Sequence, residues 1–136
     1  MVEERLKEIK RIFNSYGRNT AQLGQLALPG IKGVAYDKIA VMTDKGSNAV
    51  EQLIFTYLID KERLEKEIAL VDKVYEYFFD DRDVELAELI DIRFRHGKPH
   101  WVAANGVYIS DRQALRWLEK AYAKAEEIGL QMHLFE

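Results

Sequence analysis

The feature that most constrains the fold of this chain is an uninterrupted stretch from about Ser47 to Phe79, which contains neither glycine nor proline. Because these two residues are the usual helix breakers, we expect one long helix of about 50 Å. Apolar residues recur along it at alternating spacings of four and three, with Lys61 as the one polar break, as in a coiled coil. The residues of this seam are Val50, Ile54, Tyr57, Leu64, Ile68, Val71, Tyr75 and Phe78.

The seam has two interpretations. It can pack against another part of the same chain, or against a second copy of the protein. Large exposed apolar seams are rare on monomers, so we expect self-association into a homo-oligomer, most simply a dimer.

The N-terminal residues 2–16 repeat the pattern and predict a first helix that joins this association. Their apolar positions are Val2, Leu6, Ile9, Phe13 and Tyr16. Residues 17–46 hold five of the eight glycines, and we expect an irregular connection there. Such a long connection is unusual in a compact domain, so we expect this segment to be functional, mobile or packed along its neighbours. Residues 1–80 are therefore predicted to form a helical arm for oligomerisation.

A C-terminal head is predicted to follow, because the acidic run 80–83 breaks the long pattern and offers caps for a new helix. That helix is expected from Val84 to about Phe94. After a turn at 96–99, a short helix is expected over Pro99–Asn105, with Gly106 ending it in a left-handed conformation.

The segment that follows Gly106 predicts a second, longer helix. Ser110 suits the N-cap, and Gln113 three residues later completes an S-x-x-Q capping box. Apolar residues at helical spacing follow at Ala114, Leu115, Leu118, Ala121, Tyr122 and Ala125. A short helix, a tight turn and a capped helix form the outline of a helix-turn-helix, whose second helix enters the major groove of DNA. The alternative is a capped amphipathic helix with ordinary solvated charges.

The side chains off the apolar stripe suit DNA. Arginine and glutamine hydrogen-bond to base edges, and lysine binds phosphates. The candidate DNA-binding residues are Lys98, Ser110, Asp111, Arg112, Gln113, Arg116, Lys120 and Lys124. We expect the head to span residues 81–128 and residues 129–136 to form a tail that docks or frays.

The distribution of charge agrees with this interpretation, although the net charge is −3. Residues 91–124 hold seven basic side chains against three acidic ones, whereas residues 50–90 hold five against twelve. Affinity for phosphate depends on the local field rather than on the total charge, and the basic excess falls on the predicted helix-turn-helix.

Several classes of protein are not expected. The chain has no cysteine, so it has neither disulfides nor thiolate metal sites. His96 and His100 are separated by a turn and a proline, which argues against a metal site there. No catalytic triad or phosphate loop has defensible spacing, so we expect neither an enzyme nor a cofactor. No apolar run is long enough to span a bilayer, so we expect a soluble cytoplasmic protein.

The residues Ile109–Arg116, preceded by an arginine–aromatic helix end and a glycine turn, resemble the C-terminal part of the RinA/ArpU-type phage transcriptional regulators. Proteins of that family look like a sigma factor region 4 appended to a helical arm. The resemblance covers roughly residues 36–126 and is strongest over 86–122. The chain departs from the family pattern at Ala103, where a larger aliphatic residue is usual, and at Gly106, which falls inside the end of the first motif helix.

The resemblance implies an all-α protein with an N-terminal helix, a long coiled-coil-like helix and a three-helix head. It implies that Ser110 caps the recognition helix and that Arg112, Gln113 and Arg116 face DNA. It also implies a small core of Trp101, Ala104, Val107, Ile109, Ala114 and Leu118. The expected function is sequence-specific regulation of phage late genes in the host bacterial cell, with contact to host RNA polymerase as a further expectation.

Two other functions fit the same sequence. A small-terminase-like packaging protein also combines a helix-turn-helix with an oligomerising arm, and a ring of many subunits would favour it over a dimeric regulator. A helical protein–protein adaptor that does not bind DNA would show no preferred sequence and little dependence on salt.

Overall fold

The computed structural model describes residues 3–25, 47–81 and 83–135 of the chain, and all regular secondary structure in these residues is helical. The predicted all-α fold class is therefore confirmed. The elements are α1 (Glu3–Asn14), α2 (Tyr16–Gln25), α4 (Ser47–Asp80), α5 (Val84–Ile90), the π-helix η1 (Asp91–Arg95), α6 (His100–Gly106) and α7 (Asp111–Gln131).

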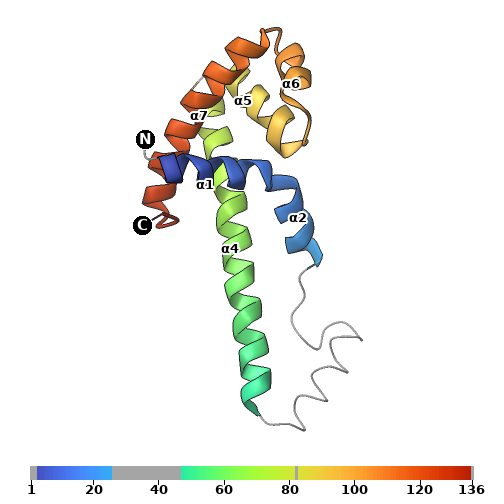
Figure 1. Cartoon of the computed structure of the whole chain (residues 1–136), viewed down its shortest axis with the longest axis vertical. Coiled ribbons are helices and arrows are strands. Elements are labelled where there is room, and N and C mark those ends of the chain that lie inside the picture. The colour runs from blue at the N-terminus through green and yellow to red at the C-terminus, as the bar shows by residue number, and fades with distance from the viewer. Residues whose placement is uncertain (1–2, 26–46, 82, 136) are drawn as a thin grey trace.

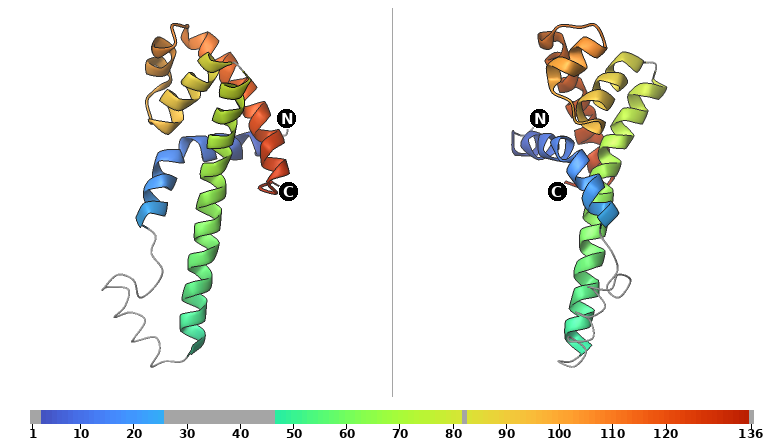
Figure 2. Two further views of the ribbon diagram at one scale, coloured as in Figure 1. Left: turned by 180° about the vertical axis from the view of Figure 1, so that it is seen from behind. Right: turned by 90° about the vertical axis from the view of Figure 1, so that its right-hand side faces the viewer.

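The long helix α4 runs through the whole height of the molecule, as Figure 1 shows. Its 34 residues agree with the length expected from the absence of helix breakers. Its C-terminal half is covered by α1, α2, α5 and α7, while its N-terminal half projects beyond the other helices (Figures 1 and 2).

This packing corrects part of the predicted oligomerisation seam. Leu64, Val71 and Phe78 are almost fully buried inside their own chain, so they are not available to a second copy. Ile68 and Tyr75 are partly buried, and Tyr75 packs against the same core. Towards the other end, Tyr57 is partly exposed and Ile54 is exposed. Of Val50, only its place in α4 is described. The predicted contact with a second copy is therefore wrong for the seam residues that pack inside their own chain.

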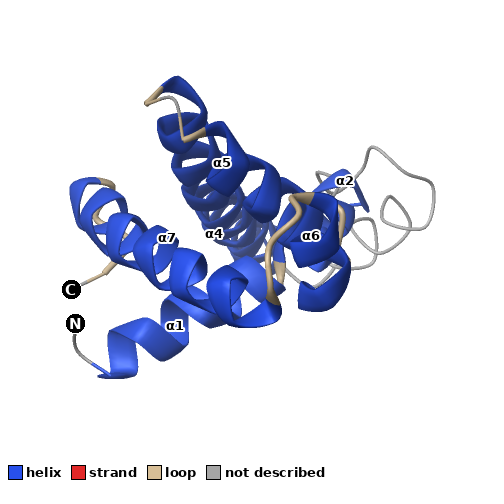
Figure 3. Ribbon diagram, turned by 90° about the horizontal axis from the view of Figure 1, so that it is seen from above, coloured by secondary structure: helices blue, strands red, loops and turns tan. Residues whose placement is uncertain are grey.

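Helix α1 crosses α4 and lies against α7 (Figures 1 and 3). Ile9, Ile12 and Phe13 are buried, and the edge of the Phe13 ring meets the rings of Phe94 and Tyr122 at centroid distances of 5.0 and 5.5 Å. Of the predicted apolar positions, Leu6, Ile9, Phe13 and Tyr16 therefore pack within the chain, whereas a contact with a second copy was predicted. Val2 lies outside the described residues.

A buried carboxylate helps to fix α1 on α4. The Glu67 side chain is only 2% exposed, and the Arg11 guanidinium donates to it at 2.5 Å. Arg63 lies 3.7 Å from the other oxygen, and Arg11 also donates to Glu8. The contact with Arg11 holds the pKa of Glu8 below its ordinary value. A buried charge needs such partners, because its desolvation is costly when it is left alone.

Part of the predicted irregular connection is helical. Residues 17–25 belong to α2, which packs along α4. Gly17 and Gly24 lie inside this helix, where a single glycine lowers stability without preventing helix formation. The Tyr16 hydroxyl at its start donates to Asp72 of α4 at 2.9 Å. Residues 26–46, the rest of the predicted connection, lie outside the described residues.

The predicted arm and head share one core. Buried residues of α1, α4, α5, α6 and α7 form a single cluster, so the packing shows no boundary near residue 80. The predicted boundary at residue 128 also differs from the structure, because α7 continues to Gln131. Leu134 and Phe135 then fold back onto the core, and the Phe135 ring lies against Gly129, where a side chain would collide with it.

Candidate nucleic-acid interface

The two helices of the predicted helix-turn-helix are present as α6 and α7, joined by residues 107–110 (Figure 1). The Ser110 hydroxyl accepts a hydrogen bond from the backbone N–H of Gln113 at 3.1 Å, which confirms Ser110 as the N-cap of α7. The side chain of Gln113 makes no return hydrogen bond within the described chain, so the capping box is one-sided and this amide is free.

The turn between the helices differs from the prediction. Gly106 is the last residue of α6, and the left-handed conformation falls on Tyr108, with φ of 60°. Gly106 serves a close approach instead, because a Cβ at this position would lie 2.9 Å from Cδ1 of Ile92. Tyr108 is 95% exposed at the tip of the turn. A tyrosine in this conformation is strained, a feature found often at functional sites.

The core that holds α6 against α7 follows the predicted set with one exception. Ala104, Val107, Ala114 and Leu118 are buried and Ile109 is partly buried. Trp101, in contrast, is 55% exposed and was wrongly placed in this core. The buried side of α6 is set by residues 103, 104 and 107, and Trp101 lies about 110° away around the helix.

Leu115, which was expected to widen the apolar stripe of α7, is 55% exposed. The buried positions of α7 are centred on Ala114, Ala121 and Ala125, which are small residues that bring the helix close to its neighbours. Trp117 is partly buried against the core.

The residues predicted to read bases lie on the open side of α7. Arg112, Gln113 and Arg116 are all exposed. Arg112 and Arg116 are one turn apart and share a face. Neither arginine side chain forms an ion pair or hydrogen bond with any described residue. Asp111 is exposed in the first turn, where an acidic side chain stabilises the helix dipole.

The three lysines predicted to bind phosphate are placed differently from one another. Lys98 is exposed just before α6. Lys120 pairs with Asp83 at 3.0 Å while remaining 64% exposed, and exposed ion pairs are weak enough to exchange for a phosphate. Lys124 lies on Tyr77 of α4, 3.9 Å from the ring centroid, and is 20% exposed. It is about 18 Å along α7 from Arg112, which places it away from the open end of the helix.

Two aromatic side chains of the head are exposed. Trp101 at the start of α6 and Tyr108 in the turn before α7 are 55% and 95% exposed. The left-handed backbone at Tyr108 has no sequence signal, because glycine or asparagine is the usual residue there.

The histidines do not form a metal cluster in the described part of the chain. His96 Nδ1 lies 3.1 Å from the backbone oxygen of Asp91 and 3.4 Å from its carboxylate, and no third ligand of a suitable kind joins them. No described helix is long and apolar enough to cross a membrane.

Replacing the N-cap tests the local structure of this site. We expect Ser110→Ala to lower the free energy of unfolding by about 1 kcal/mol, because an N–H of the first turn loses its acceptor. Urea unfolding followed by circular dichroism measures the change. Ser110→Asp restores an acceptor and should unfold like the wild type; equal loss in both variants would contradict the cap.

No family model, curated protein or solved structure matches this chain.

Proposed function

We propose that this protein is a sequence-specific DNA-binding transcriptional regulator that places α7 in the major groove. The observation that supports this most is the pair Arg112 and Arg116, which lie exposed on the first turns of a capped helix, without an ion pair to any described residue. Their donors are available to a ligand, so little side-chain pairing has to be broken on binding.

The chemistry of these side chains favours base reading. Arginine donates two parallel hydrogen bonds to O6 and N7 of guanine, and the free amide of Gln113 can pair with adenine. Lys98 and Lys120 are exposed, and their ammonium groups suit phosphates. Lys124 lies farther along α7 and packs on Tyr77, so we assign it a smaller contribution to phosphate binding.

The biological setting of the proposal rests on the resemblance to the RinA/ArpU-type regulators. It suggests control of phage late genes, with contact to host RNA polymerase through the region-4-like head. The acidic surface of α4 is the part of the molecule that complements a basic partner.

We further propose that two copies pair through the N-terminal half of α4. Ile54, Phe55, Leu58 and Ile59 are 38–65% exposed on this helix, beyond the part that the other described helices cover. A dimer of this kind would set two heads at a fixed spacing, as is usual for helix-turn-helix proteins on two half-sites.

The pairing is tested by charge substitution. We expect Phe55→Glu and Leu58→Glu to convert a dimer into a monomer in sedimentation velocity, because each places a charge in an apolar contact. Thr56→Glu is the matched control, since Thr56 is exposed on the same stretch of helix. A monomeric wild type would contradict the dimer, and a ring of many subunits would favour a packaging protein.

The function itself is tested by selection of bound duplexes from a random DNA pool. We expect an enriched sequence in two similar parts, one for each head of the dimer. Absence of any enrichment, together with no binding at physiological salt, would overturn the proposal and favour a protein adaptor.

A further inference from the structure

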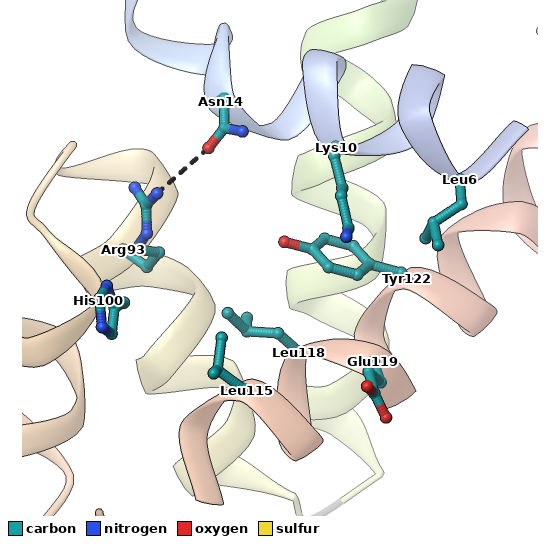
Figure 4. Close-up of a pocket in the computed structure, with 9 residues that line it drawn as sticks. All are labelled: Leu6, Lys10, Asn14, Arg93, His100, Leu115, Leu118, Glu119 and Tyr122. Carbon is teal, nitrogen blue, oxygen red and sulfur yellow. Dashed lines mark hydrogen bonds between the residues drawn. The ribbon is translucent and has the colours of Figure 1, made fainter. Parts of the chain in front are cut away.

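A half-enclosed cavity of about 370 Å³ opens between α1 and the head. Figure 4 shows that it is bounded by α1 on one side and by η1, α6 and α7 on the others. Its volume is within the range of small-molecule sites. Apart from α7, none of these elements belongs to the surface proposed to read bases.

Basic side chains from three elements line the cavity. They are Lys10 from α1, Arg93 from η1 and His100 from α6. Among the described residues, Arg93 donates to two neutral oxygens, the side-chain oxygen of Asn14 and the backbone oxygen of Lys98, each at 3.3 Å. The Lys10 ammonium lies 5.8 Å from the centroid of the Tyr122 ring.

This positive charge is not balanced within the described chain. None of the three basic side chains forms an ion pair with a described carboxylate. Glu119 is the one acidic residue of the lining, and its carboxylate points away from the three basic side chains in Figure 4. A half-enclosed site with two cationic side chains, Lys10 and Arg93, and no facing carboxylate favours an anion.

Apolar side chains make up much of the remaining lining. Leu6 comes from α1, Leu115 and Leu118 come from α7, and the Tyr122 ring lies next to the Lys10 ammonium (Figure 4). The exposure of Leu115, unexpected from the sequence, arises because this side chain lies at the cavity rather than in the core. Burial raises the pKa of the Tyr122 hydroxyl, which therefore stays neutral and can donate a hydrogen bond.

We propose that this cavity binds a small organic anion, a carboxylate or a phosphate monoester on an apolar body. The anionic group would lie between Lys10, Arg93 and His100, with the apolar body against Leu115 and Leu118. Guanidinium groups bind both anions through paired hydrogen bonds, so the two sources share one recognition chemistry. The site does not depend on whether the protein binds DNA.

The test uses the full chain and four probes of similar shape: benzoate, phenyl phosphate, benzyl alcohol and benzylamine. We expect at least one of the two anions to bind with a dissociation constant of about 1 mM or below, as measured by titration calorimetry. The neutral alcohol and the cationic amine should bind at least about tenfold more weakly. The relative affinities of benzoate and phenyl phosphate distinguish the two anion classes. Amide signals of ¹⁵N-labelled protein should shift at residues 10, 93, 100 and 115.

Variants localise the binding. Lys10→Gln should weaken the anion about tenfold, because one charge-assisted hydrogen bond is lost. Lys7→Gln is the control, since Lys7 is an exposed lysine of the same helix and does not line the cavity. Binding of neither anion at about 10 mM would overturn the proposal. Equal binding of benzyl alcohol, or equal loss in the two lysine variants, would do the same.

Discussion

Replacing Phe13 by alanine is expected to lower the free energy of unfolding by about 3–5 kcal/mol, the largest effect of any single substitution proposed for this chain. Phe13 is fully buried, and its ring meets Phe94 of η1 and Tyr122 of α7 edge to face. The loss combines the removed apolar surface, the cavity left behind and two aromatic contacts. Chemical denaturation followed by circular dichroism measures it.

The matched control is Phe79→Ala. Phe79 is 52% exposed on α4, so its loss should cost about 1 kcal/mol or less. If Phe13→Ala cost no more than this control, α1 would not be docked on the head, and the cavity between them would not exist as described. The substitution thus tests how the N-terminal helix is placed.

The second large effect is expected on DNA affinity. Arg112→Ala and Arg116→Ala should each weaken binding to the selected duplex by about 1–3 kcal/mol and relax the preference at the base pair that each contacts. Fluorescence anisotropy with the selected duplex and with point-substituted duplexes measures both quantities. The expected loss depends on the open position of these two side chains at the start of α7.

Two further variants separate base reading from general attraction. Lys120→Ala should weaken all duplexes alike and lower the salt slope by about 1, because it removes a phosphate contact. Lys73→Ala, on an exposed part of α4, should change neither. If both arginine variants bound the selected duplex as tightly as the wild type, α7 would not be the recognition helix.

Local signals predicted the helices well. The absence of glycine and proline between residues 47 and 79 was sufficient to predict α4, and Ser110 marked the start of α7 correctly. These features act over a few residues, through backbone restriction and a single side-chain hydrogen bond. The predicted helix from Val84 to about Phe94 also holds, although it changes from α to π geometry at Asp91.

The partner of an apolar face could not be predicted in the same way. A four–three spacing reports that one side of a helix is apolar, and it is the same whether the partner is a second copy or another helix of the chain. Leu64 and Val71 proved to be buried within the monomer, while Ile54 is exposed. Which of these seam residues are buried and which are exposed depends on how the other helices pack against α4.

The cavity was also out of reach of the sequence. It joins Lys10 to Arg93 and His100, which lie more than eighty residues later in the chain. Trp101 could not be placed from the sequence either. An aromatic residue at the start of a short helix can be buried or exposed, depending on which other elements pack against that helix, and Trp101 is exposed.

The central claim is that α7 binds duplex DNA, and chemical-shift mapping tests it most directly. ¹⁵N-labelled full chain would be titrated with a mixed-sequence duplex at low salt, before any preferred sequence is known. DNA binding predicts that amide signals of residues 110–120 and of the start of α6 shift together and return as salt is added. Signals that stay in place at low salt, or that shift only along α4, would contradict it.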